Sequence, residues 1–466
     1  MRLVSSTGIL WSLLAVAASA QSPTAQRALE RAIFKELIEV NTSDSAGHTP
    51  ELAAAIATRL KAAGFPDNDI TVLGFNPRYQ SLVARYRGRA SGKKPIMLMA
   101  HLDVVDARKE DWSFDPYVFK EDGGFYYGRG TNDNKAGVAT LVANFIRLKQ
   151  EQFVPDRDLI MVLTADEETL GESIAWLMKE HRALIDAEYA LNTDAGGGGL
   201  VNGKAQTFSV QTAEKVYLTF TFEARNKGGH SSIPVKDNAI YRLATGLGRL
   251  ATIDFPVRLN ETSRAFFERS AVSETGQTAA DMKALAATSD PAAAARLSAL
   301  SPYYNSVMRT TCVATRLLGG HADNALPQMA RATVNCRILP DDTPEAVQAV
   351  LTRVLADPEV QITTAQPAKP SPPSPLRADV IGPVERIAKQ MWPTATMVPE
   401  MSTGATDGLY VRNGGIPVYG VGALFDDIND TRAHGRDERV GVESFHQAVS
   451  FWYQLLKALT SGDKSA

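Results

Sequence analysis

The 466-residue chain has only two cysteines, Cys312 and Cys336, so it is not a small scaffold held together by disulfides. It also has no basic block, because 49 Lys and Arg residues against 52 Asp and Glu give a formal net charge of −3. This balance argues against nucleic acid or an anionic membrane as the main partner. Beyond the N-terminus, no apolar run is long enough to cross a bilayer. These absences leave a globular protein, and its length favours two domains over one.

Residues 1–20 have the pattern of a secretory signal peptide. Arg2 precedes a short apolar segment at 9–17, and small residues follow up to Ala20. We therefore expect cleavage after Ala20, export to a periplasm or beyond, and no membrane attachment of the mature chain. An uncleaved anchor is the weaker alternative, because the apolar run is short. In an oxidising compartment Cys312 and Cys336 can pair, but the sequence leaves both pairing and free thiols open.

Strand-like and helix-like segments alternate in the first 195 residues. Apolar spacing predicts helices at 26–40, 51–63, 136–149 and 171–180, and strands at 81–86, 96–100, 159–163 and 189–192. This alternation predicts an α/β fold with a mostly parallel sheet flanked by helices. Ligands of such sheets gather beyond the carboxyl ends of the strands. The residues that follow each predicted strand are therefore the candidates for chemistry.

Three adjoining carboxylates, Asp166, Glu167 and Glu168, follow the predicted strand at 159–163. Neighbouring acids repel one another unless a cation lies among them, and a metal ion is the simplest such cation. A solvated acidic turn is the ordinary alternative, and it is favoured for this stretch taken alone.

Other metal-binding residue types occur at further predicted strand ends. His101 follows the strand at 96–100, and Asp103 shares a face with it and can orient its imidazole. Asp133 precedes a predicted helix, Asp194 begins a glycine-rich loop, and His434 lies in a polar loop near the C-terminus. Each has an ordinary explanation, such as a core histidine or a helix cap. Together they match the ligands of zinc, and a carboxylate between two ions allows a pair.

The middle of the chain is predicted to be an inserted α+β domain at 213–366. It combines predicted strands at 216–222, 311–318 and 332–339 with helices at 238–251 and 344–355 and an alanine-rich helical stretch up to 300. The proline-rich segment 367–375 is expected to be an extended linker. The first domain would then comprise 21–212 and 367–466.

In order and spacing, these motifs resemble the co-catalytic zinc exopeptidases and deacylases: glutamate carboxypeptidase, aminoacylase, succinyl-diaminopimelate desuccinylase and the carnosinase-type dipeptidases. The motifs are His101-Leu102-Asp103-Val104-Val105, the segment 128–137, the segment 166–171 and the loop at His434. The resemblance covers residues 29–459. It implies a zinc-exopeptidase-like catalytic domain with an inserted lid domain that commonly forms a homodimer.

The resemblance implies a role for each residue of the cluster. His101 and Asp194 would hold one Zn²⁺, Glu168 and His434 the other, and Asp133 would bridge both. Co²⁺ or Mn²⁺ could substitute for zinc. Glu167 would be the general base and acid, because two zinc ions bring the pKa of a bound water towards neutrality. Asp103 would orient His101, and Asp166 would be a structural neighbour.

The resemblance also implies four residues outside the metal cluster. His230, in Gly228-Gly229-His230-Ser231-Ser232, would stabilise the oxyanion, often in the site of the partner subunit. Asn324 and Arg337 match lid residues that contact substrate, and Arg337 suits a bidentate clamp on a carboxylate. Gly404 matches a backbone contact to that carboxylate. The remaining histidines have no such support and are interpreted as ordinary packing or surface residues: His48, His181, His321 and His446.

The leading functional hypothesis is an exported dizinc metallohydrolase of the metallocarboxypeptidase type. It would cleave a peptide or amide bond next to a free α-carboxylate in a small peptide or N-acyl amino acid. Asp194 resembles the dipeptidases and some Gly-Xaa carboxypeptidases and N-acyl amino acid hydrolases, whereas glutamate is usual in glutamate carboxypeptidases and desuccinylases. An N-acyl amino acid deacylase and a dipeptidase therefore stay open. The alternative hypothesis that is not an enzyme is a non-catalytic binding protein with this fold, and the presence of Glu167 with all five ligands argues against it.

Overall fold

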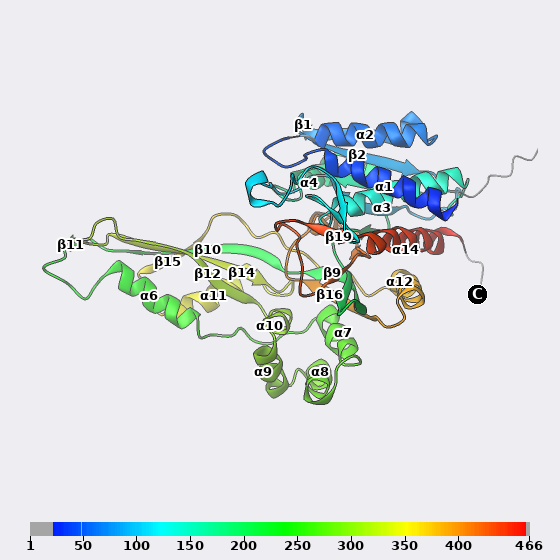
Figure 1. The fold of residues 1–466 in the computed structure, drawn as a ribbon. Coiled ribbons are helices and arrows are strands. Elements are labelled where there is room, and N and C mark those ends of the chain that lie inside the picture. Colours follow the sequence, from blue (N-terminus) through cyan, green and yellow to red (C-terminus); the bar gives the residue numbers. More distant parts are fainter. Residues whose placement is uncertain (1–21, 48, 463–466) are drawn as a thin grey trace, which may run out of the picture.

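A ten-stranded sheet forms the largest part of the molecule (Figure 1). The computed structural model describes residues 22–47 and 49–462, so the predicted signal peptide at 1–20 lies outside the described residues. The strand order is β1 (Ile70–Asn76), β2 (Tyr79–Tyr86), β6 (Leu159–Thr164), β3 (Ile96–His101), β7 (Tyr189–Asn192), β17 (Val418–Gly420), β9 (Lys204–Glu214), β8 (Gly197–Val201) and β18 (Phe425–Asp427). A tenth strand, β16 (Thr396–Ser402), pairs with β9.

The centre of this sheet is parallel, as the sequence predicted. Strands β6, β3, β7 and β17 run in one direction, while β2 runs antiparallel to β6 and β9 antiparallel to β17. All residues of β3 and β6 are buried, since helices cover both faces of the sheet. This double coverage explains the continuous apolar runs in the sequence. It also places the carboxyl ends of β6, β3 and β7 side by side.

Two layers of helices provide this coverage. One core contains Phe34, Phe145 and Trp452, from α1 (Pro23–Glu39), α3 (Lys135–Gln150) and α14 (Val442–Thr460), and α2 (Thr49–Ala62) and α12 (Ala378–Met391) also pack there. The opposite core contains residues of α4 (Glu172–Glu180), α5 (Arg182–Ile185) and α13 (Gly408–Asn413). None of the helices in the described residues is long and apolar enough to cross a membrane.

A second, four-stranded antiparallel sheet is built from residues 216–364 and projects from the first (Figure 1). Its order is β12 (Thr311–Gly319), β14 (Met329–Ile338), β10 (Val216–Arg225) and β15 (Val360–Thr364), and α6 (Ala239–Leu250) and α11 (Pro344–Leu355) share its core. Cys312 and Cys336 face each other across β12 and β14 and form a disulfide, which selects pairing from the two open alternatives. The division of the chain into domains at 213 and 366 stays a prediction.

The alanine-rich stretch forms a helical unit of its own. It contains α7 (Glu261–Ser270), α8 (Gly276–Thr288), α9 (Pro291–Leu300) and α10 (Pro302–Met308). Its core includes Val398 and Met401, so it packs against β16 of the large sheet. The sequence predicted helices here but not their packing partner. This unit therefore supports the strand that borders the candidate site.

Candidate metal centre and active site

The five predicted metal ligands lie together at the carboxyl edge of the parallel strands. His101 ends β3, and Glu168 and Asp194 lie in the segments that follow β6 and β7. Asp133 precedes α3, and His434 lies between β18 and β19 (Arg439–Gly441). Three sets of three residues have donor atoms within 4.8 Å of one another: His101, Asp133 and Asp194; Asp133, Glu168 and His434; and His101, Glu167 and Glu168. Asp133 belongs to the first two of these sets, and it is the residue to which the family resemblance assigns the bridging role, which stays a prediction.

His101 is oriented for metal binding by the chain around it. Its Nδ1 lies 3.0 Å from the backbone oxygen of Asp103 and 3.5 Å from the Asp103 carboxylate. Nδ1–H therefore donates to one of these oxygens, which leaves Nε2 as the ligand atom. Nε2 faces Asp133 at 2.9 Å and Asp194 at 3.3 Å. This arrangement fixes the tautomer that a metal-binding imidazole needs.

His434 completes the second set from a loop that is far away in sequence. Its Nε2 lies 2.9 Å from Glu168 Oε1 and 3.1 Å from Asp133 Oδ2. Hydrogen bonds to Asp133 and Glu168 raise the pKa of His434 to about 10. The same negative charge that holds a proton on this imidazole would attract a metal cation. Unlike His101, the side chain is half exposed, so this ion position is open to the cavity.

The cluster carries more negative charge than the protein itself neutralises. Burial raises the pKa of Asp194 to about 7, and burial together with the charge of Asp194 raises the pKa of Glu167 well above its ordinary value. Among the described residues that line the adjoining cavity, there is no lysine or arginine. Closely spaced carboxylates and imidazoles without a lysine or arginine beside them are a donor set for divalent cations, and zinc accepts both ligand types. The residues present therefore fit a dinuclear metal centre.

Asp103 positions the acidic turn as well as His101. Its carboxylate accepts the backbone N–H of Glu167 at 3.1 Å and that of Glu168 at 2.9 Å. The same side chain therefore links the histidine of one donor set to the turn that supplies the other. Asp166 points away from the cluster, because its carboxylate accepts the N–H groups of Glu172 and Ser173 at the start of α4.

Glu438 fixes the loop that supplies Asp133, a role that no sequence motif indicated. Its fully buried carboxylate accepts N–H from Gly130, Asn132 and Asp133 at 2.7 to 3.1 Å. It also pairs with the buried Arg129 at 2.6 Å. These partners lie more than 300 residues away in the chain. The one sequence signal was a glutamate four residues after His434, in a loop that contains several other charged residues.

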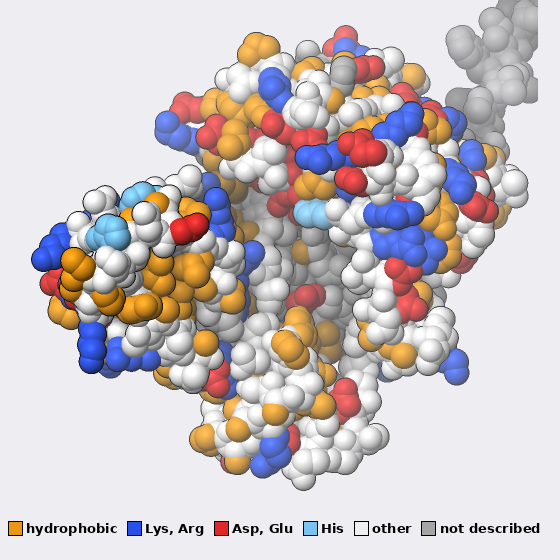
Figure 2. All heavy atoms as spheres, turned by 60° about the vertical axis from the view of Figure 1, so that its left-hand side comes forward, with side chains coloured by type: hydrophobic (Ala, Val, Ile, Leu, Met, Phe, Trp, Pro, Cys, Tyr) orange, Lys and Arg blue, Asp and Glu red, His pale blue; other side chains and the backbone are white. Residues whose placement is uncertain are grey.

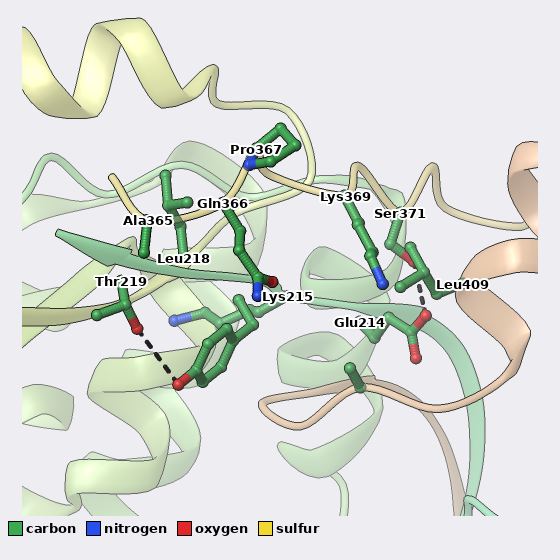
Figure 3. Close-up of a pocket in the computed structure, with 12 residues that line it drawn as sticks. Glu214, Lys215, Leu218, Thr219, Ala365, Gln366, Pro367, Lys369, Ser371 and Leu409 are labelled. Carbon is green, nitrogen blue, oxygen red and sulfur yellow. Dashed lines mark hydrogen bonds between the residues drawn. The ribbon is translucent and has the colours of Figure 1, made fainter. Parts of the chain in front are cut away.

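The metal centre opens into a cavity of about 540 Å³. Glycines 196–199, three polar residues of β9 (Thr207, Ser209 and Gln211), and Glu400 and Ser402 of β16 line its wall. Figure 2 shows the hollow between the second sheet and the main body of the protein. A second cavity of about 420 Å³ lies where segments 214–219 and 365–371 pass between the two sheets (Figure 3). Ala405 lines both cavities.

The predicted substrate-binding residues fall into two groups. Arg337 lies near Gly404, since its Nη1 donates to the backbone oxygen of Thr403 at 3.0 Å. Its guanidinium also stacks 4.7 Å from the centre of the Tyr217 ring. His230 and Asn324 are not brought to the metal centre of their own chain. They lie next to each other near the short strands β11 (Gly229–His230) and β13 (Ala325–Leu326), at the far end of the second sheet (Figure 1).

The other histidines have ordinary surroundings. His446 is buried and hydrogen-bonds to Glu30 at 2.5 Å, which is a packing role. His181 packs against Trp176, and His321 is exposed. His48 lies outside the described residues.

The chain belongs to peptidase family M20/M25/M40, whose profile matches residues 97–458. Human N-fatty-acyl-amino acid synthase/hydrolase PM20D1 is 27% identical over 382 residues, which cover 80% of this chain and 75% of the relative. The M20 family metallo-carboxypeptidase Sso-CP2 of Sulfolobus solfataricus has the same fold, with a TM-score of 0.67, 18% identity and coverage of 92% and 99%. The YXEP protein of Bacillus subtilis, a dinuclear metal binding peptidase of family M20, also has this fold. Its TM-score is 0.59 at 14% identity, and the match covers 94% of this chain and 100% of that protein.

The predicted family and its enzymatic nature are thereby confirmed. The protein is a hydrolytic enzyme, a peptidase or an N-acyl amino acid hydrolase, of a family that includes dinuclear metal enzymes. The rival hypothesis of a non-catalytic binding protein is not supported.

Proposed function

We propose that the protein is an exported dizinc hydrolase that cleaves a peptide or amide bond next to a free α-carboxylate, as a metallocarboxypeptidase does. The observation that carries this proposal is that Asp133 is shared by two donor sets, with Glu167 beside both. Zinc is the metal that this mixture of histidine and carboxylate favours. Export rests on the signal-like pattern of residues 1–20.

The protein would hold one zinc ion with His101 and Asp194 and the other with Glu168 and His434, with Asp133 between them. When bound, zinc supplies Lewis acidity and lowers the pKa of water towards neutrality.

Glu167 would move the proton of the reaction. Its side chain lines the cavity next to Glu168, and burial raises its pKa well above that of an ordinary glutamate, which makes it a better proton acceptor. It would accept a proton from the attacking water as a bond forms between the water oxygen and the carbonyl carbon. It would then deliver that proton to the nitrogen as the C–N bond breaks. Asp103 keeps Glu167 in place through its backbone N–H.

The free α-carboxylate of the substrate would bind near Gly404. Arg337 lies beside this loop and has no acidic partner among the described residues, so its guanidinium can form a bidentate pair with a carboxylate. Burial lowers the pKa of Arg337, which reflects the cost of keeping this cation away from water without a counter-ion. A bound carboxylate would offset that cost.

Two related activities share this chemistry. An N-acyl amino acid deacylase has a precedent in the human relative, which is named an N-fatty-acyl-amino acid synthase/hydrolase. A dipeptidase would use the same carboxylate contact. A screen of blocked dipeptides, free dipeptides and N-acyl amino acids against the purified, zinc-loaded protein separates the three.

The second sheet would form a homodimer. Its edge strand β12 exposes Val313, Leu317 and Leu318, which are 60%, 64% and 54% exposed. An exposed apolar edge strand invites pairing with another chain. His230 and Asn324 lie far from their own metal centre, and a partner subunit would bring them to the other site, where His230 would stabilise the oxyanion.

Mixing two inactive variants tests this arrangement. His230→Ala and Glu167→Gln subunits should each be inactive as homodimers, and a random mixture should regain about a quarter of wild-type activity, since one site in each heterodimer is complete. A monomer by light scattering, or no recovery on mixing, would contradict the shared site.

The Glu167→Gln variant also tests the mechanism. We expect it to bind two zinc ions as the wild type does and to lose about 10²–10⁴-fold in kcat. The exposed Glu172→Gln substitution, five residues along, is the matched control and should retain activity. Removal of metal with a chelator should abolish wild-type hydrolysis, and added zinc should restore it. Full activity in Glu167→Gln would refute the proposed proton transfer.

A further inference from the structure

One acidic residue in the wall of the active-site cavity belongs to neither donor set and has no basic partner. Glu400 lies on β16 and lines the cavity together with the metal-binding residues. Its hydrogen-bond partner is the hydroxyl of Ser209, and no lysine, arginine or histidine of the described residues forms an ion pair with it. The surrounding strands and helices enclose the carboxylate, while the residue keeps partial exposure towards the cavity. Burial raises the pKa of Glu400 for this reason.

The strands around Glu400 present a polar surface to the cavity. Strands β9 and β16 are parallel neighbours, and Glu400 lies opposite Gln211. Thr207, Ser209 and Gln211 alternate along β9, so their side chains share one face. Ser402, two residues after Glu400, lines the same cavity. This wall therefore offers hydroxyl, amide and carboxylate groups instead of the apolar surface that a hydrocarbon chain requires.

The other acids of the cavity are accounted for. Three belong to the donor sets, and Glu167 is the proposed base. Burial raises the pKa of Asp426, but this carboxylate accepts a hydrogen bond from Asn132 at 2.5 Å and lies near the positive charge of Arg439, which both favour its ionised form. Among the described residues that line the cavity, Glu400 is the one acid that belongs to no donor set, is not the proposed base and has no basic group beside it. A largely desolvated carboxylate is unfavourable unless a cation or several donors meet it, and here the cavity is the open direction.

Glu400 favours a positively charged group of the substrate, whereas the loop at Gly404, beside Arg337, favours a negatively charged one. An extended strand rises by about 3.3 Å per residue, so about 7 Å separates Glu400 from Ser402, where β16 ends. The loop then reaches Thr403, whose oxygen contacts Arg337. A substrate carboxylate is attracted to Arg337 and repelled by Glu400. Glu400 is therefore placed to meet the acyl portion of a substrate whose carboxylate lies near Gly404.

We propose that Glu400 is a specificity-determining residue that binds a protonated amine on the acyl portion of the substrate. This inference rests on the proposed amide hydrolysis and extends it to a substrate class: small peptides or acyl amino acids whose acyl group carries a cation. An amine would donate to Glu400 and meet the hydroxyls of Ser209 and Ser402 nearby. An alkyl chain of equal length would leave the carboxylate without a partner.

Matched substrates test the proposal directly. N-(6-aminohexanoyl)-phenylalanine and N-heptanoyl-phenylalanine differ only in a terminal ammonium or methyl group, and shorter pairs, such as β-alanyl with butanoyl, vary the reach. For at least one chain length, the wild type should hydrolyse the amine about 10- to 100-fold faster in kcat/KM, the range of a charge-assisted hydrogen bond. Glu400→Gln keeps the shape and removes the charge. It should abolish this preference while retaining hydrolysis of the alkyl substrate.

Glu385→Gln is the charge-matched control, since Glu385 is exposed on α12 and lies outside the cavity. It should keep the wild-type preference. A preference that survives in Glu400→Gln, or a wild type that treats both members of every pair alike, would overturn the role of Glu400 and leave the proposed hydrolysis intact. If the zinc-loaded wild type cleaves no substrate of either kind, the proposed function itself fails.

Discussion

Replacement of Glu438 should weaken both the fold and the metal centre. The buried carboxylate pairs with Arg129 and accepts three backbone N–H groups of the loop that supplies Asp133. In Glu438→Ala, a buried guanidinium loses its counter-ion, which costs about 3–5 kcal/mol. Arg129 keeps bonds to the backbone oxygens of His434 and Gly435, so we expect the lower half of this range.

The same substitution should reduce metal affinity. Asp133 is held by its own N–H, 3.1 Å from the Glu438 carboxylate, and without this contact the shared ligand of both donor sets loses its fixed position. The loss of such a supporting contact typically lowers metal affinity by about 10- to 100-fold. Glu438→Gln retains an oxygen acceptor, so its effects should lie between those of the wild type and Glu438→Ala.

Two measurements separate these effects. Urea unfolding of the protein after removal of metal with a chelator reports the stability of the fold, and calorimetric titration with zinc reports metal affinity. The control is Glu443→Ala, because Glu443 forms a largely exposed pair with Arg27 that is worth at most about 1 kcal/mol. If Glu438→Ala unfolds at the same urea concentration as the control and binds zinc with wild-type affinity, Glu438 does not hold the loop.

Two further predictions concern the region around the second sheet. Burial lowers the pKa of Lys215 to about 7 from 10.5, so the folded state holds fewer protons than the unfolded state between these values, and stability from this residue rises with pH across that window. Lys215→Met should therefore be about 2–4 kcal/mol more stable than wild type at pH 6, a range that allows for the lost hydrogen bond to the backbone oxygen of Arg309. Urea unfolding of both proteins over a range of pH should show this advantage vanish near pH 10.5. A stability difference between Lys215→Met and wild type that stays constant at all pH values would show that Lys215 does not titrate in this way. The double substitution of Cys312 and Cys336 by alanine should lower the unfolding free energy by about 3 kcal/mol, since the disulfide closes a loop of 24 residues. An unchanged melting curve would show that the disulfide does not stabilise the fold.

Local sequence patterns were sufficient for most of the fold. The runs at 96–100 and 159–163 predicted β3 and β6 within one residue, because strands covered on both faces have no polar alternation. Helical spacing predicted α11 at its observed bounds and α3 within one residue at each end. The packing of α7–α10 against β16 was not predictable, since their alanines fit many surfaces equally well.

The candidate site was also predictable from the sequence only in part. All five predicted ligands meet, because each belongs to an element that ends at one edge of the sheet, although their metal roles stay predictions. Glu438 was missed because its partners are separated from it by 305 to 309 residues, so no local spacing reveals them. Glu400 had a weak signal, as the one charged residue of strand β16.

The sequence by itself therefore determined the fold class, the family and the residue types available for metal binding. These follow from periodicity and motif order, which are local properties of the chain. Only the tertiary structure decided which acids are paired and which remain free in the cavity. That distinction depends on burial and on long-range contacts: the same side chain, glutamate, fixes a loop at Glu438, and at Glu400 it faces an open cavity without a cation.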